Sequence, residues 1–397
     1  MCSVSSKPPG HVGQASSAPD LRLRSQLRRT DVVRAVRRAL QSAGVAEGPL
    51  VVACSGGPDS TALMLAVALL REAEGALSHL VSVDHQLRSS AAQEVRDVVA
   101  VAQRLGLTGH ALRVSVPSGP SRQAQARTAR YAALVDQAEQ LGAGWICLGH
   151  SRDDQAETML MRWLAGAGTR GLSGMQAVAH PSLNRPSRVR LLRPLLSISR
   201  AQIDAFLQVA APLIAPLPVD DPSNRDPHYL RARLRHDVLP TLRRVAPHLD
   251  AHLLELADQL HHDAEYLDQQ ARLAVSSLLA SGSAHADAVA PDRLAVSVDR
   301  LSSLPPALAA RVFRLLLGTE LGARHVLALR SLCARTGGRQ WLDLPGCGRV
   351  ERRRDLLLFS RRAPARATHS AGAQAGAAAA LQPNSEHPVL DGWEQDA

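Results

Sequence analysis

The chain has 397 residues, 45% of them hydrophobic, which is enough for a buried core and allows about two to three domains. Its formal charge of +10 indicates a polyanionic partner such as nucleic acid, although an arginine-rich genome would give the same balance. The longest apolar run, residues 62–70, is too short to cross a membrane, so we expect no membrane partner. An odd number of cysteines without a Cys-x-x-Cys pair fits a reducing cytoplasm, which is the location we expect.

The lysine and cysteine content excludes several kinds of chemistry. Lys7 is the only lysine, which rules out a Schiff base or a P-loop lysine in the folded core. The cysteines form no Cys-x-x-Cys pair, which argues against a disulfide framework, a zinc site or a cysteine-held iron–sulfur cluster. They are Cys2, Cys54, Cys147, Cys333 and Cys347.

The chain begins with a Ser- and Arg-rich stretch, and we expect residues 1–45 to be a partly disordered N-terminal extension. From Leu50 onward, short apolar runs alternate with helical patterns. This rhythm predicts an α/β fold, a doubly wound parallel sheet covered by helices on both faces. The expected strands are 50–54, 79–84, 110–116 and 145–149, and the expected helices are 60–74, 91–105, 122–141 and 153–164.

The sequence changes character near Arg243, so we expect one domain at 46–242 and a second, mainly helical domain at 243–362. The second domain contains helical patterns at 243–279 and 305–317 and ends with strand-like alternation at 337–359. Residues 363–397 are rich in Ala, Gly, Gln and Ser, which is typical of a disordered tail.

A Gly-rich turn joins the first expected strand to its helix. Its glycines allow the backbone to approach a ligand, and the helix N-terminus favours an anion such as pyrophosphate. The acidic Asp59 is expected either to hold a metal ion or to cap the helix. The turn reads Ser55-Gly56-Gly57-Pro58-Asp59-Ser60.

This hexapeptide resembles the Ser-Gly-Gly-x-Asp-Ser signature of the N-type ATP pyrophosphatases, the PP-loop superfamily. The resemblance implies a Rossmann-like fold that binds ATP and Mg²⁺ and cleaves ATP to AMP and pyrophosphate. It assigns the whole hexapeptide to ATP binding and Asp59 also to catalysis and metal binding. Members include several amide-forming synthetases, tRNA thiolases and tRNA(Ile)-lysidine synthetases.

Two further segments resemble the lysidine synthetases: Asp84-His85-Gln86-Leu87-Arg88 and Ala126-Arg127-Thr128-Ala129-Arg130-Tyr131. Arg127 and Arg130 are three residues apart, so they share a helix face that can clamp a phosphate. The resemblance implies ATP binding by His85 and Arg130 and catalysis by Arg127. A structural histidine and a solvated helix face are the alternatives.

The segment from Gly149 to Thr158 resembles the family's Gly-His-x-x-Asp-Asp-Gln-Ala-Glu-Thr. It implies a catalytic His150, lysine binding by Asp154 and Glu157, and a metal contact by Asp153. These carboxylates lie on one helical turn, where they repel one another unless a cation is present. Capping of the helix N-terminus is the alternative.

Asp220-Asp221-Pro222-Ser223-Asn224 and the following Arg231, Arg233 and Arg235 resemble another family block, in which Ala232 replaces the usual Asn. The three arginines suggest a basic surface for tRNA, and a solvated helix is the alternative. Leu344-Pro345-Gly346 resembles a late family segment.

The resemblance implies that lysine is ligated to C2 of the wobble cytidine in the CAU anticodon of tRNA(Ile), through an adenylated cytidine. The partners are then ATP, L-lysine and this tRNA, bound in part by the domain at 243–362, and a homodimer stays open. The general base is either His150 or one of the carboxylates. The rival interpretations are a tRNA thiolase, an amide-forming synthetase of a small metabolite, and a non-catalytic RNA-binding protein.

Overall fold

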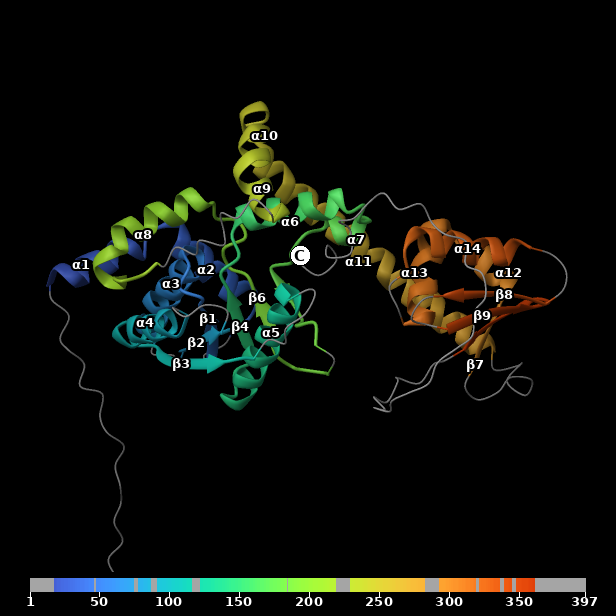
Figure 1. Ribbon diagram of the computed structural model, residues 1–397, viewed down its shortest axis with the longest axis horizontal. Coiled ribbons are helices and arrows are strands. Elements are labelled where there is room, and N and C mark those ends of the chain that lie inside the picture. Colours follow the sequence, from blue (N-terminus) through green and yellow to red (C-terminus); the bar gives the residue numbers. More distant parts are fainter. Residues whose placement is uncertain are drawn as a thin grey trace, which may run out of the picture. The chain divides into compact units, whose positions relative to one another are not determined.

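The computed structural model describes residues 18–45, 48–74, 78–86, 91–115, 122–183, 185–218, 229–282, 293–318, 321–335, 339–344 and 348–360 (Figure 1). The chain divides into two compact units, and the boundary lies between Asp258 and Gln259. This boundary falls inside helix α11 (Leu249–Gly282).

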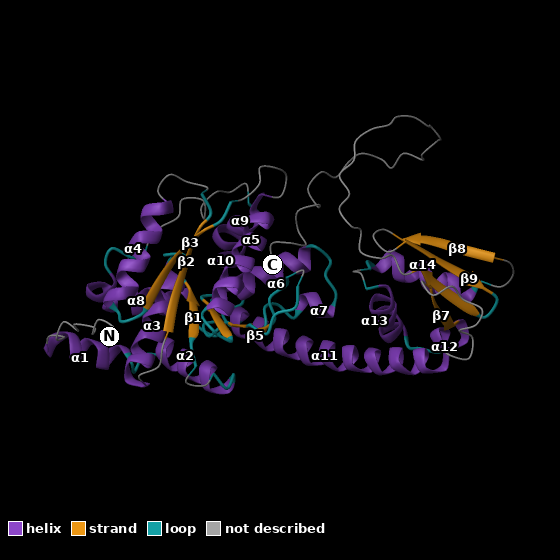
Figure 2. Ribbon diagram, turned by 90° about the horizontal axis from the view of Figure 1, so that it is seen from below, coloured by secondary structure: helices purple, strands orange, loops and turns teal. Residues whose placement is uncertain are grey.

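The first unit is built on a six-stranded sheet whose order is β3-β2-β1-β4-β6-β5. All neighbouring strands are parallel except β5 and β6. Figure 2 shows β1, β2 and β3 side by side. The strand bounds are β1 Leu50–Ala53, β2 Ser78–Asp84, β3 Thr108–Arg113, β4 Trp145–Leu148, β5 Val178–Ala179 and β6 Arg190–Leu192. The predicted α/β fold class is confirmed.

Helices cover both faces of this sheet, because its central strands are apolar on each side. On one face, α3 supplies a run of buried residues from Ala62 to Leu70 and packs with α2, α4 and α8. On the other face, Tyr131, Leu134 and Val135 of α5 pack against β1, β2 and β4. The helices that follow β1 are α3 Pro58–Glu74, α4 Ala91–Arg104, α5 Arg122–Gln140, α6 Arg152–Leu164, α7 Thr169–Leu172, α8 Arg200–Ile214, α9 Leu230–Arg233, the π-helical turn Leu234–Val238, and α10 Leu239–Val245.

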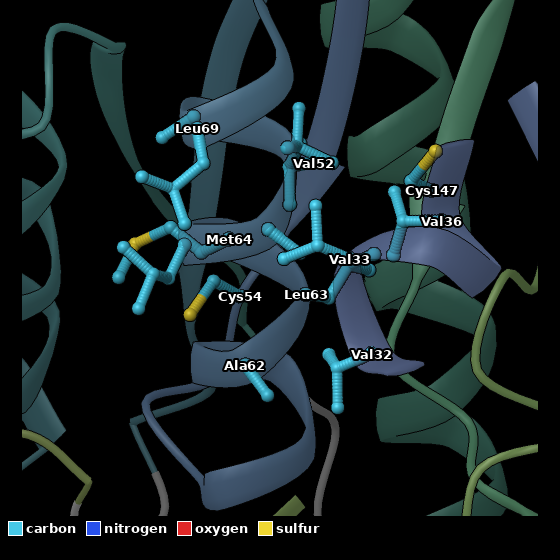
Figure 3. Packing of buried hydrophobic residues seen from close by; sticks show 14 of the residues in the cluster. Val32, Val33, Val36, Val52, Cys54, Ala62, Leu63, Met64, Leu69 and Cys147 are labelled. Carbon is cyan, nitrogen blue, oxygen red and sulfur yellow. The ribbon is translucent and has the colours of Figure 1, made fainter. Parts of the chain in front are cut away.

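The N-terminal segment differs from its prediction. Helices α1 (Ala18–Leu27) and α2 (Asp31–Ser42) form there, and Val33 and Val36 of α2 are fully buried. Figure 3 shows Val33 beside Leu63 of α3 and Val36 beside Cys147 of β4, and all four belong to one buried cluster. The expectation of a disordered extension is therefore wrong from Ala18 onward, because α2 completes one face of the core; residues 1–17 lie outside the described part of the chain.

The second unit combines helices with a small antiparallel sheet of order β7-β10-β9-β8. Its core includes Phe313, Leu329 and Phe359, which are almost completely buried. None of the helices in the described residues is long and apolar enough to cross a membrane. The elements are β7 Arg293–Ser297, α12 Val298–Ser302, α13 Pro306–Leu317, α14 Ala323–Ala334, β8 Arg339–Leu344, β9 Gly348–Arg353 and β10 Leu356–Ser360.

Candidate active site

The Gly-rich turn lies between the end of β1 and the first turn of α3. Gly56 has φ +86°, a conformation that favours glycine. The Ser60 hydroxyl accepts from the Ser55 backbone N–H at 3.2 Å and donates to the Gly57 carbonyl at 3.0 Å. The turn is therefore held by its own side chains at the carboxyl edge of the sheet. Its position at a helix N-terminus suits an anionic group.

Gly149, directly after β4, presses against this turn. A Cβ atom at Gly149 would lie 2.8 Å from Ser60 Cα and 2.9 Å from the Asp59 carbonyl carbon and oxygen. These are backbone atoms, so they cannot move aside cheaply. Only a residue without a side chain allows β4 and the start of α3 to approach this closely.

We expect Gly149→Ala to lower the free energy of unfolding by about 1–3 kcal/mol, because the added methyl group overpacks this contact. Pyrophosphate release should also fall, since Asp59 and Ser60 would shift. Gly144→Ala is the matched control, because a Cβ at Gly144 meets nothing within 4 Å. Denaturant unfolding of both variants checks this, and equal stabilities would contradict it.

Asp59 lies in the first turn of α3, with one oxygen paired and the other not. Its Oδ2 accepts from Arg200 Nη1 at 3.2 Å, whereas its Oδ1 is buried and has no hydrogen-bond partner. Burial raises the pKa of Asp59 to about 6, the charge of Asp154 adds to this shift, and Arg200 opposes it. An unpaired carboxylate oxygen beside an anion-binding turn fits a cation.

A metal at this place would have few protein ligands. No group of three or more His, Cys, Asp or Glu residues that could hold a metal occurs within the described ranges. Mg²⁺ in nucleotide-binding sites uses one or two carboxylates together with substrate phosphates, so Asp59 alone fits this ion. Asp153 does not fit well: its Oδ2 accepts from the Arg200 backbone N–H at 2.7 Å and its Oδ1 from Arg243 at 2.6 Å.

Asp154 and Glu157 come together on α6, as the sequence predicts, and both are buried. Ser151 holds Asp154 in a capping box, with the Ser151 backbone N–H 2.9 Å from Asp154 Oδ2. Burial would raise the pKa of Asp154, but the charges of Arg231 and other neighbours lower it overall. Asp154 therefore takes part in capping α6 through Oδ2, whereas the capping box does not include Glu157.

Two arginines from the segment after Tyr229 neutralise this acidic pair. Arg231 donates to Glu157 Oε2 at 2.7 Å and to Asp154 Oδ1 at 2.8 Å. Arg235 donates to Glu157 Oε1 at 2.5 Å and to Asp154 Oδ1 at 3.2 Å. The four side chains make one ion-pair cluster, with buried carboxylates and half-buried arginines, that ties α6 to α9 and the π-helical turn.

The basic surface expected from Arg231, Arg233 and Arg235 is thereby corrected. Arg231 and Arg235 are four residues apart, so they share the helix face that meets α6. Arg233 points elsewhere, is exposed, and has no carboxylate partner in the part of the chain that the structure describes. Only Arg233 keeps the free, solvent-facing position that was predicted for all three.

His85 and His150 follow β2 and β4 at the same edge of the sheet, and the Nδ1 atom of each is buried without a partner. Burial lowers the pKa of His150, and the nearby Arg193 cation lowers it further. Burial also lowers the pKa of His85, and the Arg130 cation lowers it further. Both rings are therefore neutral at physiological pH.

Arg127 and Arg130 share one face of α5, as predicted, and both lie over the ring of Tyr131. Their Cζ atoms are 5.3 and 5.7 Å from the ring centroid. Burial lowers the pKa of Arg130, and the Arg127 and Arg231 cations contribute to this. Neither arginine has a carboxylate partner among the residues described.

Four further arginines of the candidate active site were not predicted from the sequence: Arg162, Arg193, Arg200 and Arg243. Arg193 could have been noticed, since it directly follows the apolar run of β6. The others carry no local signal in an arginine-rich chain. The predicted segments 87–88, 220–224 and 345–346 lie outside the described residues.

Comparisons with known proteins agree with this geometry. The PP-loop domain family matches residues 29–242. The chain is 41% identical to a tRNA(Ile)-lysidine synthase of Salinispora arenicola, a match that covers 82% of this chain and 94% of the relative. It is 37% identical to a tRNA(Ile)-lysidine synthase of Thermobifida fusca, covering 82% and 95%.

The parallel sheet, the glycine-rich turn and the family match define a PP-loop nucleotide-binding protein. The matches to these relatives extend beyond that domain and cover nearly the full length of each relative. The chain belongs to the tRNA(Ile)-lysidine synthase family, and the resemblance seen in the sequence is confirmed.

Proposed function

We propose that this protein is an ATP-dependent ligase that joins lysine to C2 of the wobble cytidine of tRNA(Ile), in its CAU anticodon. The products are lysidine, AMP and pyrophosphate, and the modified tRNA reads AUA instead of AUG. The observation that carries the proposal is the anion-binding turn, with Asp59 beside it, in a chain related over most of its length to tRNA(Ile)-lysidine synthases.

In the first step, the C2 oxygen of cytidine attacks the α-phosphorus of ATP and pyrophosphate leaves. Negative charge then develops on the leaving group, where the amides of the turn and the α3 N-terminus stabilise it. Ser55, Gly56, Gly57, Pro58 and Ser60 would form this cradle. Mg²⁺ bound by Asp59 and the phosphates would neutralise further charge. His85 and Arg130, at the edge formed by β2 and α5, would contact the rest of ATP.

In the second step, the neutral ε-amine of lysine attacks C2, the C2–oxygen bond breaks, and AMP leaves. The buried Asp154 and Glu157 would bind the substrate's amino groups by exchanging part of their contact with Arg231 and Arg235. A low pKa keeps His150 neutral, so its free Nδ1 would accept a hydrogen bond from the attacking amine. Arg127, on the same side of the sheet, would stabilise the phosphate that is transferred.

The two parts of the chain would have different roles. Residues 46–242 would carry ATP chemistry, and residues 243–362 would contribute to tRNA binding. Thiolation is disfavoured because Cys54, Cys147 and Cys333 are all buried and none pairs with another. A cytoplasmic location fits a tRNA-modifying activity.

Pyrophosphate release from ATP, measured with lysine and with or without tRNA(Ile), tests the proposal. Release that depends on this tRNA, together with lysine recovered in the tRNA, supports it. Release with a small-molecule acceptor alone would indicate an amide-forming synthetase. Absence of release with all three substrates would indicate a binding protein.

Among the three arginines after Tyr229, we expect only Arg233 to act mainly through RNA phosphates. Arg233→Ala should weaken tRNA binding and reduce the log–log salt slope by roughly 0.7–0.9, while the ATP KM stays unchanged. Arg185→Ala is the control, since two acidic groups, Asp136 and Glu139, already neutralise Arg185. An Arg233→Ala salt slope equal to that of the control would contradict the role.

A further inference from the structure

Arg162 and Arg193 both donate to backbone carbonyls of residues 171–176, and the charge of Arg127 acts on both, so these three arginines form a cluster. Its members are Arg127 of α5, Arg162 of α6 and Arg193, which follows β6. Strands β4 and β6 are parallel neighbours with Cys147 opposite Leu192, so Arg193 and His150 leave the sheet at the same edge. The cluster therefore borders the candidate active site.

These guanidinium groups lack an anion. Arg193 is only 8% exposed, yet it meets no carboxylate among the described residues: its Nη1 donates to the Gln176 carbonyl at 2.7 Å, and its Nε is buried without a partner. Arg162 donates only to the carbonyls of Gly171 and Gly174, both at 2.8 Å. Arg24 and Arg231, by contrast, meet carboxylates.

Leaving a buried charge without a counterion is costly, so its retention indicates a ligand of opposite charge. The pKa values of Arg162 and Arg193 are lowered, first by burial and then by neighbouring cations that include Arg127, with Tyr131 opposing the shift at Arg193. The buried and unpartnered Nδ1 of His150 adds a neutral group beside the arginines. Planar guanidinium groups suit phosphate oxygens in particular.

We propose that Arg162 and Arg193, together with Arg127, bind one phosphate group of a nucleotide substrate at the β4–β6 edge of the active site. This deepens the proposed function and rests on it. The turn after β1 leads into α3, whereas Arg127 lies on α5, which packs on the opposite face of the sheet, so we assign the arginines a phosphate other than the pyrophosphate held by the turn. The phosphate comes either from the RNA backbone beside the target cytidine or from ATP.

The test uses Arg162→Gln and Arg193→Gln in the full chain, with Arg190→Gln as the control. Arg190 lies in β6, is exposed, and stacks on Trp145 at 3.9 Å, so the control removes the same charge without touching the cluster. Dissociation constants are measured separately for tRNA(Ile) and for ATP at fixed salt. Thermal unfolding without ligands is measured for each variant.

We expect at least about tenfold weaker binding of tRNA or of ATP by both variants, because a charge-assisted contact is lost. Weakening of tRNA binding assigns the RNA backbone as the source, and weakening of ATP binding assigns the nucleotide. We also expect no loss of thermal stability, since one like charge is removed. If Arg193→Gln fails to fold, the dissociation constants of Arg162→Gln alone test the proposal.

Variants that bind both ligands as the Arg190→Gln control does would overturn this second phosphate site. That result is distinct from failure of the proposed function, which concerns the wild-type protein. If the wild-type chain forms lysidine but the variants match the control, the function stands and only the phosphate site is lost.

Discussion

Asp59→Asn is expected to reduce pyrophosphate release by roughly a hundredfold or more, because a Mg²⁺ ion held by Asp59, as we propose, would contribute several kcal/mol of charge stabilisation and each 1.36 kcal/mol is tenfold in rate. The variant should need far more Mg²⁺ than the wild type. Asp204→Asn is the control, since Asp204 is exposed and contacts the same Arg200 at 2.9 Å. Turnover of Asp59→Asn equal to that of the control would reduce Asp59 to a helix cap.

The same substitution should stabilise the fold above neutral pH. The pKa of Asp59 is about 6 in the folded state and near 3.8 in the unfolded chain. Ionised Asp59 therefore disfavours folding above pH 6, on the order of 3 kcal/mol, and this penalty fades as the pH falls toward 4. Thermal unfolding at pH 7.5 and pH 4 should show a higher Tm for Asp59→Asn only at the higher pH.

Glu157→Gln is expected to raise the KM for lysine about tenfold or more while changing the KM for ATP little. It should also destabilise the fold by about 3–5 kcal/mol, because it leaves Arg231 and Arg235 with one carboxylate fewer in a buried cluster. Steady-state kinetics and denaturant unfolding give the two quantities independently.

Destabilisation alone would not establish lysine binding, so a matched buried pair is needed. Glu351→Gln in β9 provides it: Glu351 is 4% exposed and accepts from Arg353 at 2.7 Å. This control should lose stability without any change in lysine KM. If Glu157→Gln changes only the ATP KM, the acidic pair belongs to the nucleotide or metal site instead.

The βα elements of the first unit could be predicted from the sequence because its strands are short, apolar and buried on both faces. The observed boundaries of these strands and helices differ from the predicted ones by only a few residues. Helix α3, for example, begins at Pro58 rather than Ser60, since proline fits the first helical turn. Helix α2 was not predicted, because the Ser- and Arg-rich composition of this segment suggested disorder. The signal for a helix was the spacing of its apolar residues: Val32, Val33, Val36 and Leu40 recur at helical intervals and are buried.

The motifs located Asp154, Glu157 and His150 correctly at one edge of the sheet, but their partners could not be predicted. Arg231 and Glu157 are 74 residues apart, and nothing local distinguishes Arg231 from the exposed Arg233. The sequence likewise contains no sign that Arg200 pairs with Asp59, 141 residues away. Long-range pairing depends on the packing of α6 against α9 and of α3 against α8, which only the folded chain determines.

The cations around this site are all arginines, and the described residues contain no lysine at all. Guanidinium groups keep their charge at any physiological pH. Lysine acetylation, which neutralises many nucleic-acid-binding surfaces, has no acceptor here. The phosphate affinity that we propose for these arginines would therefore depend on the fold and the salt concentration, and neither acetyl transfer nor mild alkalinity would change it.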